Sequence, residues 1–121
     1  PVACAAGLAT IEILQREGLC EKAAKTGAYL MEGLRHLSSS FPLLGEVRGK
    51  GLIIGVEIVE GEKKKPSPQK AQEIKRHMVD KGFLFDILGP SSFRLTPPII
   101  IEQKHIDYFI DVLGLVLKEL A

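Results

Sequence analysis

The sequence has no tryptophan, few aromatic residues and no excess of charge of either sign. Its 16 Lys and Arg side chains balance 15 Asp and Glu side chains, so that the formal net charge is only +1. A nucleic-acid-binding protein normally carries a clear excess of basic residues. No apolar run extends over the roughly 20 residues that a transmembrane helix needs. We therefore expect neither a nucleic acid nor a membrane among the partners of this chain.

Cysteine and histidine are too sparse to suggest a metal site. Cys4 and Cys20, the two cysteines, lie far apart and match no metal-binding or redox spacing. His36, His77 and His105 each stand without an acid or a thiol at ligand spacing. We predict no metal site, and we interpret the cysteines as reduced thiols of a cytoplasmic protein.

Hydrophobic residues are plentiful, at 45% of a chain of 121 residues, which is enough for the core of one domain. The chain opens on Pro1, without a methionine, and continues directly into a helix-like apolar segment. This opening lacks the basic residues of a signal or transit peptide. We expect the segment to come from within a longer protein.

Apolar residues at helical spacing predict four helices. They are expected over residues 3–15, 21–37 and 68–81, and after Pro98 towards the end of the chain. Ser67 is expected to cap the third helix, with Pro68 at its first position and Gly82 as its left-handed stop. The buried stripe of the last helix is expected to comprise Ile106, Ile110, Leu113, Leu117 and Leu120.

Two further segments predict pairs of strands. "EVRGKGLIIGVEIV" (46–59) predicts a short strand, a turn at Gly49–Lys50–Gly51 and a longer strand from residue 52 to 59. "FLFDI" and "SFRLT" predict two short strands around a turn at Gly89–Pro90. Strands joined by tight turns pair antiparallel, so the fold class is α+β, with helices covering one side of a small antiparallel sheet.

The glycine-rich stretch "GKGLIIG", within residues 46–59, does not predict a nucleotide site. Its spacing differs from the dinucleotide fingerprint, and it leads into a strand, so that no helix N-terminus would hold a pyrophosphate. We interpret it as a twisted turn between strands. Glu57, which alternates with apolar neighbours, is expected to face solvent or to pair across a strand.

Arg94 is the candidate functional residue, because it is the one charged side chain in "SSFRLTPPIII". In a strand, Phe93 and Leu95 face one side of the sheet and Arg94 the other. A guanidinium presents a planar fork of donors that matches a carboxylate. Arg94 is therefore either tied to a structural Asp or Glu, which the composition and spacing favour, or available for the carboxylate of a ligand.

Three segments in order resemble a known family. They are "PVACAAGLATIEIL", "VRGKGLIIGVEI" and "FRLTPPIIIEQKHID", and together they resemble the C-terminal part of class III aminotransferases. This pyridoxal-phosphate family includes acetylornithine, ornithine and 4-aminobutyrate aminotransferases. The resemblance implies the small C-terminal domain of a fold-type I transferase, formed by residues 17–121. It also implies that residues 1–16 form a helix linking this domain to a large domain missing here.

The resemblance further implies a division of labour. Arg94 would grip the carboxylate of an amino acid or ω-amino acid that exchanges its amino group with a 2-oxo acid. The lysine that binds pyridoxal 5'-phosphate would lie in the large domain, ahead of Pro1. We therefore expect that this chain alone holds no cofactor and no catalytic residue and is inactive, and that Arg48 and Lys50 have no catalytic role. The complete enzyme would be a cytoplasmic homodimer.

Two alternatives stay open. The chain is also compatible with a freestanding α+β ligand-binding or regulatory module, in which Arg94 forms an ordinary ion pair. A third interpretation is a surface that serves mainly for dimerisation, because a face left uncovered by a large domain would be apolar.

Overall fold

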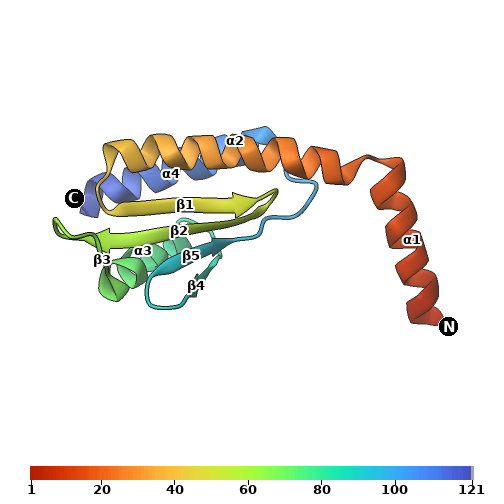
Figure 1. The fold of residues 1–121 in the computed structure, drawn as a ribbon, viewed down its shortest axis with the longest axis horizontal. Coiled ribbons are helices and arrows are strands. Elements are labelled where there is room, and N and C mark those ends of the chain that lie inside the picture. The colour runs from red at the N-terminus through yellow and green to blue at the C-terminus, as the bar shows by residue number, and fades with distance from the viewer. Residues whose placement is uncertain (121) are drawn as a thin grey trace.

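The computed structural model describes residues 1–120, which form a small sheet with helices packed on one of its faces (Figure 1). The elements are α1 (Val2–Arg16), α2 (Leu19–Ser40), β1 (Leu44–Lys50), β2 (Ile53–Glu60), β3 (Lys65–Pro66), α3 (Pro68–Asp80), β4 (Asp86–Leu88), β5 (Ser92–Leu95) and α4 (Gln103–Leu120). The predicted α+β class is confirmed.

The sheet has the strand order β1-β2-β5-β4, and every pairing in it is antiparallel. β5 therefore lies between two neighbours, whereas β4, with three residues, forms an edge. β3 pairs with the end of β2, within the polar segment that connects β2 to α3. Val59 lies opposite Pro66 in this pairing, which directs the chain from β2 into α3.

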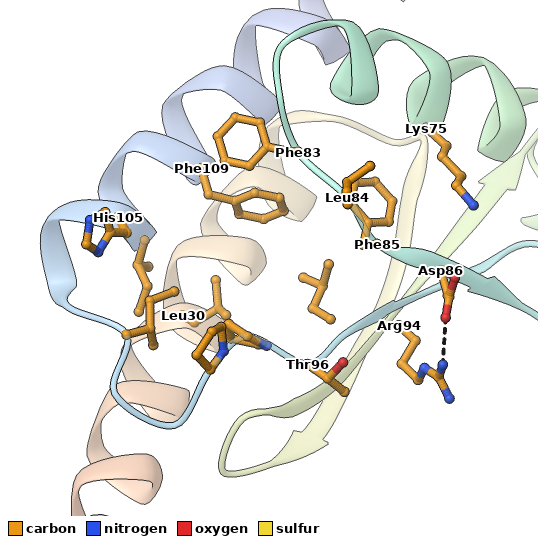
Figure 2. Close-up of a pocket in the computed structure, with 15 residues that line it drawn as sticks. Leu30, Lys75, Phe83, Leu84, Phe85, Asp86, Arg94, Thr96, His105 and Phe109 are labelled. Atoms are coloured by element: carbon orange, nitrogen blue, oxygen red, sulfur yellow. Dashed lines mark hydrogen bonds and ion pairs between the residues drawn. The ribbon is translucent and has the colours of Figure 1, made fainter.

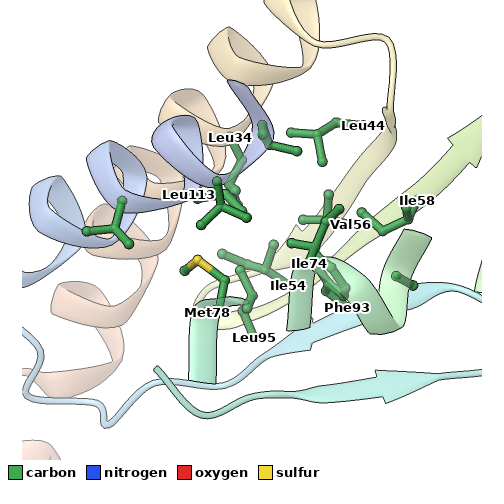
Figure 3. Packing of buried hydrophobic residues seen from close by; sticks show 14 of the residues in the cluster. Leu34, Leu44, Ile54, Val56, Ile58, Ile74, Met78, Phe93, Leu95 and Leu113 are labelled. Atoms are coloured by element: carbon green, nitrogen blue, oxygen red, sulfur yellow. The ribbon is translucent and has the colours of Figure 1, made fainter. Parts of the chain in front are cut away.

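The core lies between the sheet and the helices α2, α3 and α4 (Figure 3). Ile54, Val56 and Ile58 alternate along β2 and are almost fully buried. Leu34 of α2 and Leu113 of α4 meet them from the helix layer. Burying one such side chain contributes about 1.5–3 kcal/mol relative to leaving it exposed, so this alternation fixes which face of the sheet is covered.

The opposite face of the sheet carries charged residues. Arg48 lies opposite Gly55, Gly55 lies opposite Arg94, and Arg94 lies opposite Asp86 in the strand register. These four residues form one row across all four strands of the main sheet. The uncovered face thus aligns Arg94 with an acid on the edge strand.

The first hairpin differs by one residue from the expected turn at Gly49–Lys50–Gly51. Lys50 pairs with Ile53, so that only Gly51 and Leu52 form the loop. Gly51 adopts a φ of +55°, which a side chain would disfavour. Gly49, inside β1, is a glycine for another reason. A Cβ there would come within 2.4 Å of the Ile53 carbonyl oxygen.

Other boundaries shift for local reasons. α2 begins two residues earlier and ends three residues later than the expected range of 21–37. It starts directly after Gly18, whose backbone lies in the left-handed region. β4 begins only at Asp86, because the amide of Phe83 donates to the carbonyl of Met78 and holds that part of "FLFDI" at the end of α3. Gly82 has a φ of +89°, which confirms the predicted left-handed stop.

Two side-chain expectations about the helices are wrong in part. Ser67 is the N-cap residue of α3 by position, but its hydroxyl donates to the Glu60 carboxylate at 2.7 Å and makes no capping bond. In α4, Ile110 and Leu120 are only half-buried. Val112 and Val116 are buried instead, because α4 packs against both α2 and α3 and so buries more than one narrow stripe.

α1 stands apart from this core. Figure 1 shows it projecting away from the sheet, and none of its residues is buried. No helix within residues 1–120 combines the length and the hydropathy that crossing a membrane would require. The same residues contain no group of three His, Cys, Asp or Glu side chains that could hold a metal ion.

Candidate functional site

A cavity of about 570 Å³ opens beside the paired ends of β4 and β5 (Figure 2). Its lining comes from α2, α3, α4, both strands, the segment between α3 and β4 and the segment that follows β5. The apolar part of the lining includes Leu30, Phe83, Phe85, Leu95, Ile106 and Phe109. The polar part consists of Lys75, Asp86, Arg94, Thr96 and His105. The cavity thus joins an apolar interior to charged groups.

Aromatic rings give the apolar wall a defined shape. The rings of Phe83 and Phe109 lie 5.4 Å apart, nearly perpendicular to each other at 71°. The rings of Phe85 and Phe93 lie 4.7 Å apart. Such edge-to-face and tilted contacts restrict ring movement. The wall is therefore a firm apolar surface for a small molecule.

Arg94 faces away from the core, as the alternation of β5 predicted. Phe93 and Leu95 are buried on the helix side, whereas the Arg94 side chain is 44% exposed. Its Nη2 donates to Oδ2 of Asp86 at 2.6 Å. A partner within the chain thus exists, but the Asp86 side chain is itself 61% exposed. An exposed ion pair contributes only about 0–1 kcal/mol, so Arg94 is neither buried nor held strongly.

The chain beyond Arg94 is stiff. After Leu95, the chain continues into Thr96, Pro97 and Pro98, which line the cavity. The amide of Ile101 then donates to the Pro98 carbonyl at 2.9 Å. Two prolines fix two backbone φ angles, so the end of β5 presents Arg94 in one place.

Arg48, the other arginine of the row, has its own partners. It lies 3.0 Å from a Glu46 oxygen and 3.9 Å from a Glu57 oxygen. Glu57 was expected to face solvent or to pair across a strand, and it does both, since its side chain is 37% exposed and contacts Arg48 on the neighbouring strand. None of these three residues lines the cavity. They form a charged cluster on the sheet surface at a distance from the candidate site.

Sequence reasoning identified Arg94 but missed the other polar groups of the cavity. Lys75 comes from the inner part of α3, Asp86 from the edge strand and His105 from the first turn of α4. His105 was interpreted as an isolated histidine and lies at the rim of this cavity. Asp86 had one sequence signal, since a short turn between "FLFDI" and "SFRLT" brings an acid of one strand near the arginine of the other.

A second cavity, of about 420 Å³, lies between α2 and α4. Tyr29 donates there to the Asp107 carboxylate at 2.6 Å. This hydrogen bond to Asp107 raises the pKa of Tyr29 above its ordinary value. Glu32, His36 and Asp111 also line the cavity. The contact joins the two helices on the outside of the molecule and involves no residue of the first cavity.

Comparisons with known proteins match the whole chain. A sequence model of the family described as Aminotransferase class-III matches residues 1–117. The acetylornithine aminotransferase of Caldanaerobacter subterraneus subsp. tengcongensis is 33% identical over 120 residues, which cover 99% of this chain and 28% of that protein. The alanine/serine racemase of Pyrococcus horikoshii is 32% identical over 121 residues, covering 98% of this chain and 25% of that protein.

Solved structures have the same fold. A phospholyase from Arthrobacter in complex with phosphoethanolamine superposes with a TM-score of 0.94 at 31% identity, covering 100% of this chain and 29% of that one. An aminotransferase from Bacillus anthracis gives a TM-score of 0.91 at 31% identity, covering 98% of this chain and 28% of that one. The chain thus spans less than a third of the length of these relatives.

Proposed function

Since this chain belongs to the class III aminotransferase family, we propose that it forms the small domain of a pyridoxal-phosphate-dependent aminotransferase. The complete protein would move an amino group between an amino acid or ω-amine and a 2-oxo acid. A donor of the acetylornithine, ornithine or 4-aminobutyrate type is supported by the acetylornithine aminotransferases among the relatives. The complete protein is proposed to be a cytoplasmic homodimer.

The residues of this chain do not by themselves fit pyridoxal phosphate. The cofactor needs a lysine amine, an acid for its ring nitrogen and donors for its phosphate. Among the described residues that line the first cavity, Lys75 is the one lysine, and Asp86, the one acid, is paired with Arg94. We therefore assign no step through the cofactor to this chain. We propose that the cofactor lysine lies outside it and that the chain alone is inactive.

The proposed role of this chain is to bind and orient the substrate carboxylate through Arg94. Only Nη2 of Arg94 is engaged, in a single hydrogen bond to Asp86, whereas a guanidinium has five N–H donors. β5 is paired on both sides, with β2 and with β4. A cation on such a rigid element can place a carboxylate group accurately beside a reacting centre.

One observation carries this proposal. In a chain of this family, Arg94 is exposed at the rim of an apolar cavity and makes a single side-chain hydrogen bond. We expect Arg94→Ala in the full-length protein to raise KM for carboxylate substrates by about 10- to 100-fold, the scale of a hydrogen bond to a charged group. The absorbance of the bound cofactor should stay the same. Steady-state kinetics with several donors and acceptors measures the first effect.

The matched control is Arg48→Ala, which removes an exposed arginine from the same face of the sheet but away from the cavity. This variant should keep the KM of the unchanged protein. If Arg94→Ala leaves KM unaltered for every carboxylate substrate, Arg94 is an ordinary surface ion pair. The alternative of a ligand-binding or regulatory module would then gain support.

A further inference from the structure

The ion pair between Arg94 and Asp86 is built into the sheet. The two residues lie directly opposite each other in the antiparallel register of β4 and β5. Side chains at such positions have their Cβ atoms about 4.5–5.5 Å apart, so no loop rearrangement is needed to bring the charges together. Figure 2 shows the contact at the rim of the cavity, which both residues line.

This pair adds little to the stability of the fold, because both side chains are largely exposed and a single bond joins them. Its effect on a ligand is larger. A carboxylate that approaches the Arg94 guanidinium meets the negative charge of Asp86 already there. Two carboxylates that share one cation repel each other. Asp86 therefore competes with any acidic ligand for Arg94.

The same pair has the opposite effect on a ligand that lacks an acid group. While Asp86 holds Arg94, the cation stays neutralised beside the aromatic wall formed by Phe83, Phe85 and Phe109. Without Asp86, an uncharged group on that wall would cover part of the exposed surface of an unpaired cation, which is unfavourable.

We propose that Asp86 is a positioning residue that acts through Arg94 and sets how strongly the site selects ligands that carry a carboxylate. The inference deepens the proposed function and rests on it. In the unliganded protein Asp86 holds Nη2 of Arg94 in a single hydrogen bond, and an acidic substrate that binds the remaining donors meets the negative charge of Asp86. Removal of the Asp86 charge strengthens the binding of carboxylates and weakens that of uncharged analogues.

The test compares the full-length protein with Asp86→Asn and uses butyrate as a non-reacting ligand together with two donors that differ only in the acid group. Butyrate binding, measured by calorimetry, needs no turnover, and 4-aminobutyrate and 1-aminobutane serve as donors in kinetics. Asp86→Asn should tighten the binding of butyrate by about two- to fivefold, the scale of an exposed ion pair. KM for 4-aminobutyrate should fall with little change in kcat, and KM for 1-aminobutane should rise.

Two variants serve as controls for the charge itself. Asp86→Glu keeps a carboxylate within reach of Arg94 and should retain the butyrate affinity of the unchanged protein. Glu46→Gln removes the acid of the exposed Arg48 pair on the same face, outside the cavity, and should also leave butyrate binding unchanged. The melting temperature of every variant checks that the fold is intact.

The Arg94→Ala variant separates the two proposals. If it weakens butyrate binding while Asp86→Asn has no effect, the inference about Asp86 is overturned and the proposed function stands. If Arg94→Ala itself leaves butyrate binding and KM unchanged, the proposed role of Arg94 fails. In the double variant, Asp86→Asn should have no further effect. An equal effect with and without Arg94 would show that Asp86 does not act through that arginine and would also overturn the inference.

Discussion

At the scale of single residues, Gly27 of α2 is the glycine with the least room for a side chain. A Cβ at this position would lie 1.9 Å from the carbonyl oxygen of Gly51, in the loop between β1 and β2. Both contact partners are backbone atoms, which cannot turn aside as a side chain would. The first hairpin can therefore pack this closely against α2 only because residue 27 has no Cβ.

We expect Gly27→Ala to lower the free energy of unfolding by about 1–3 kcal/mol, because it overpacks this contact. Urea unfolding of the full-length protein, followed by circular dichroism, measures the change. Gly7→Ala is the matched control, since a Cβ there meets nothing within 4 Å. Alanine favours a helix by about 1 kcal/mol over glycine, so the control should be neutral or stabilising. Equal midpoints for the two variants would contradict the proposed contact.

The orientation of Arg94 could be predicted from the sequence, because strand alternation needs only the identity of the neighbouring residues. Its partner could be narrowed to the facing strand but not fixed. The contact with Asp86 depends on the register of β4 and β5, and that register depends on β4 beginning at residue 86. The start of β4 is decided in turn by the hydrogen bond from Phe83 to the end of α3, a contact that local sequence does not reveal.

At the scale of elements, the helices and the turn at Gly89–Pro90 were predictable, whereas the position of the first hairpin turn was not. The helical spacing of apolar residues locates α1 to within one residue at each end. Three glycines lie in and after β1, and the sequence does not distinguish their roles. Gly51 provides a positive φ, whereas Gly49 provides room for the Ile53 carbonyl. Only the paired strands show which glycine forms the turn.

The start of α3 offers a test at this scale. Aspartate is as good an N-cap residue as serine, so capping alone predicts that Ser67→Asp is neutral. In the structure, however, the Ser67 hydroxyl is buried and donates to Glu60. Aspartate would place a second carboxylate against Glu60 with no proton to donate. We expect a loss of more than about 1 kcal/mol in the free energy of unfolding, measured by urea denaturation.

A second substitution distinguishes repulsion from a general packing defect. When Glu60→Gln is added to Ser67→Asp, the amide supplies the missing donor and should restore most of the lost stability. If Ser67→Asp alone is as stable as the unchanged protein, residue 67 caps α3 after all.

At the scale of the whole molecule, α1 carries apolar side chains that the rest of the described structure leaves exposed. Leu8 is 64% exposed and Ile11 is 53% exposed, on a helix with no buried residue. Exposed apolar surface favours association by about 25 cal/mol for each Å² that is buried. The division into a linking helix (1–16) and a small domain (17–121) stays a prediction.

We expect the isolated chain to self-associate in solution through α1, as measured by sedimentation velocity over a range of concentrations. Leu8→Lys combined with Ile11→Lys should shift the distribution towards the monomer. Gln15→Lys adds a charge to the same helix at an exposed polar position and should leave the distribution unchanged. A chain that is monomeric at every concentration would exclude α1 as an association surface.

Arg94 and Asp86 lie on two strands that differ in their position in the sheet, and this affects which of the two residues mutation can change. Arg94 lies on an interior strand whose neighbours on both sides belong to the core sheet, so that changes around it disturb folding. Asp86 lies on an edge strand of three residues, with no further strand beyond it among the described residues. Mutation can therefore vary the acid while the arginine stays in place, and a mutant library at residue 86 would explore donor preference at little risk to the scaffold.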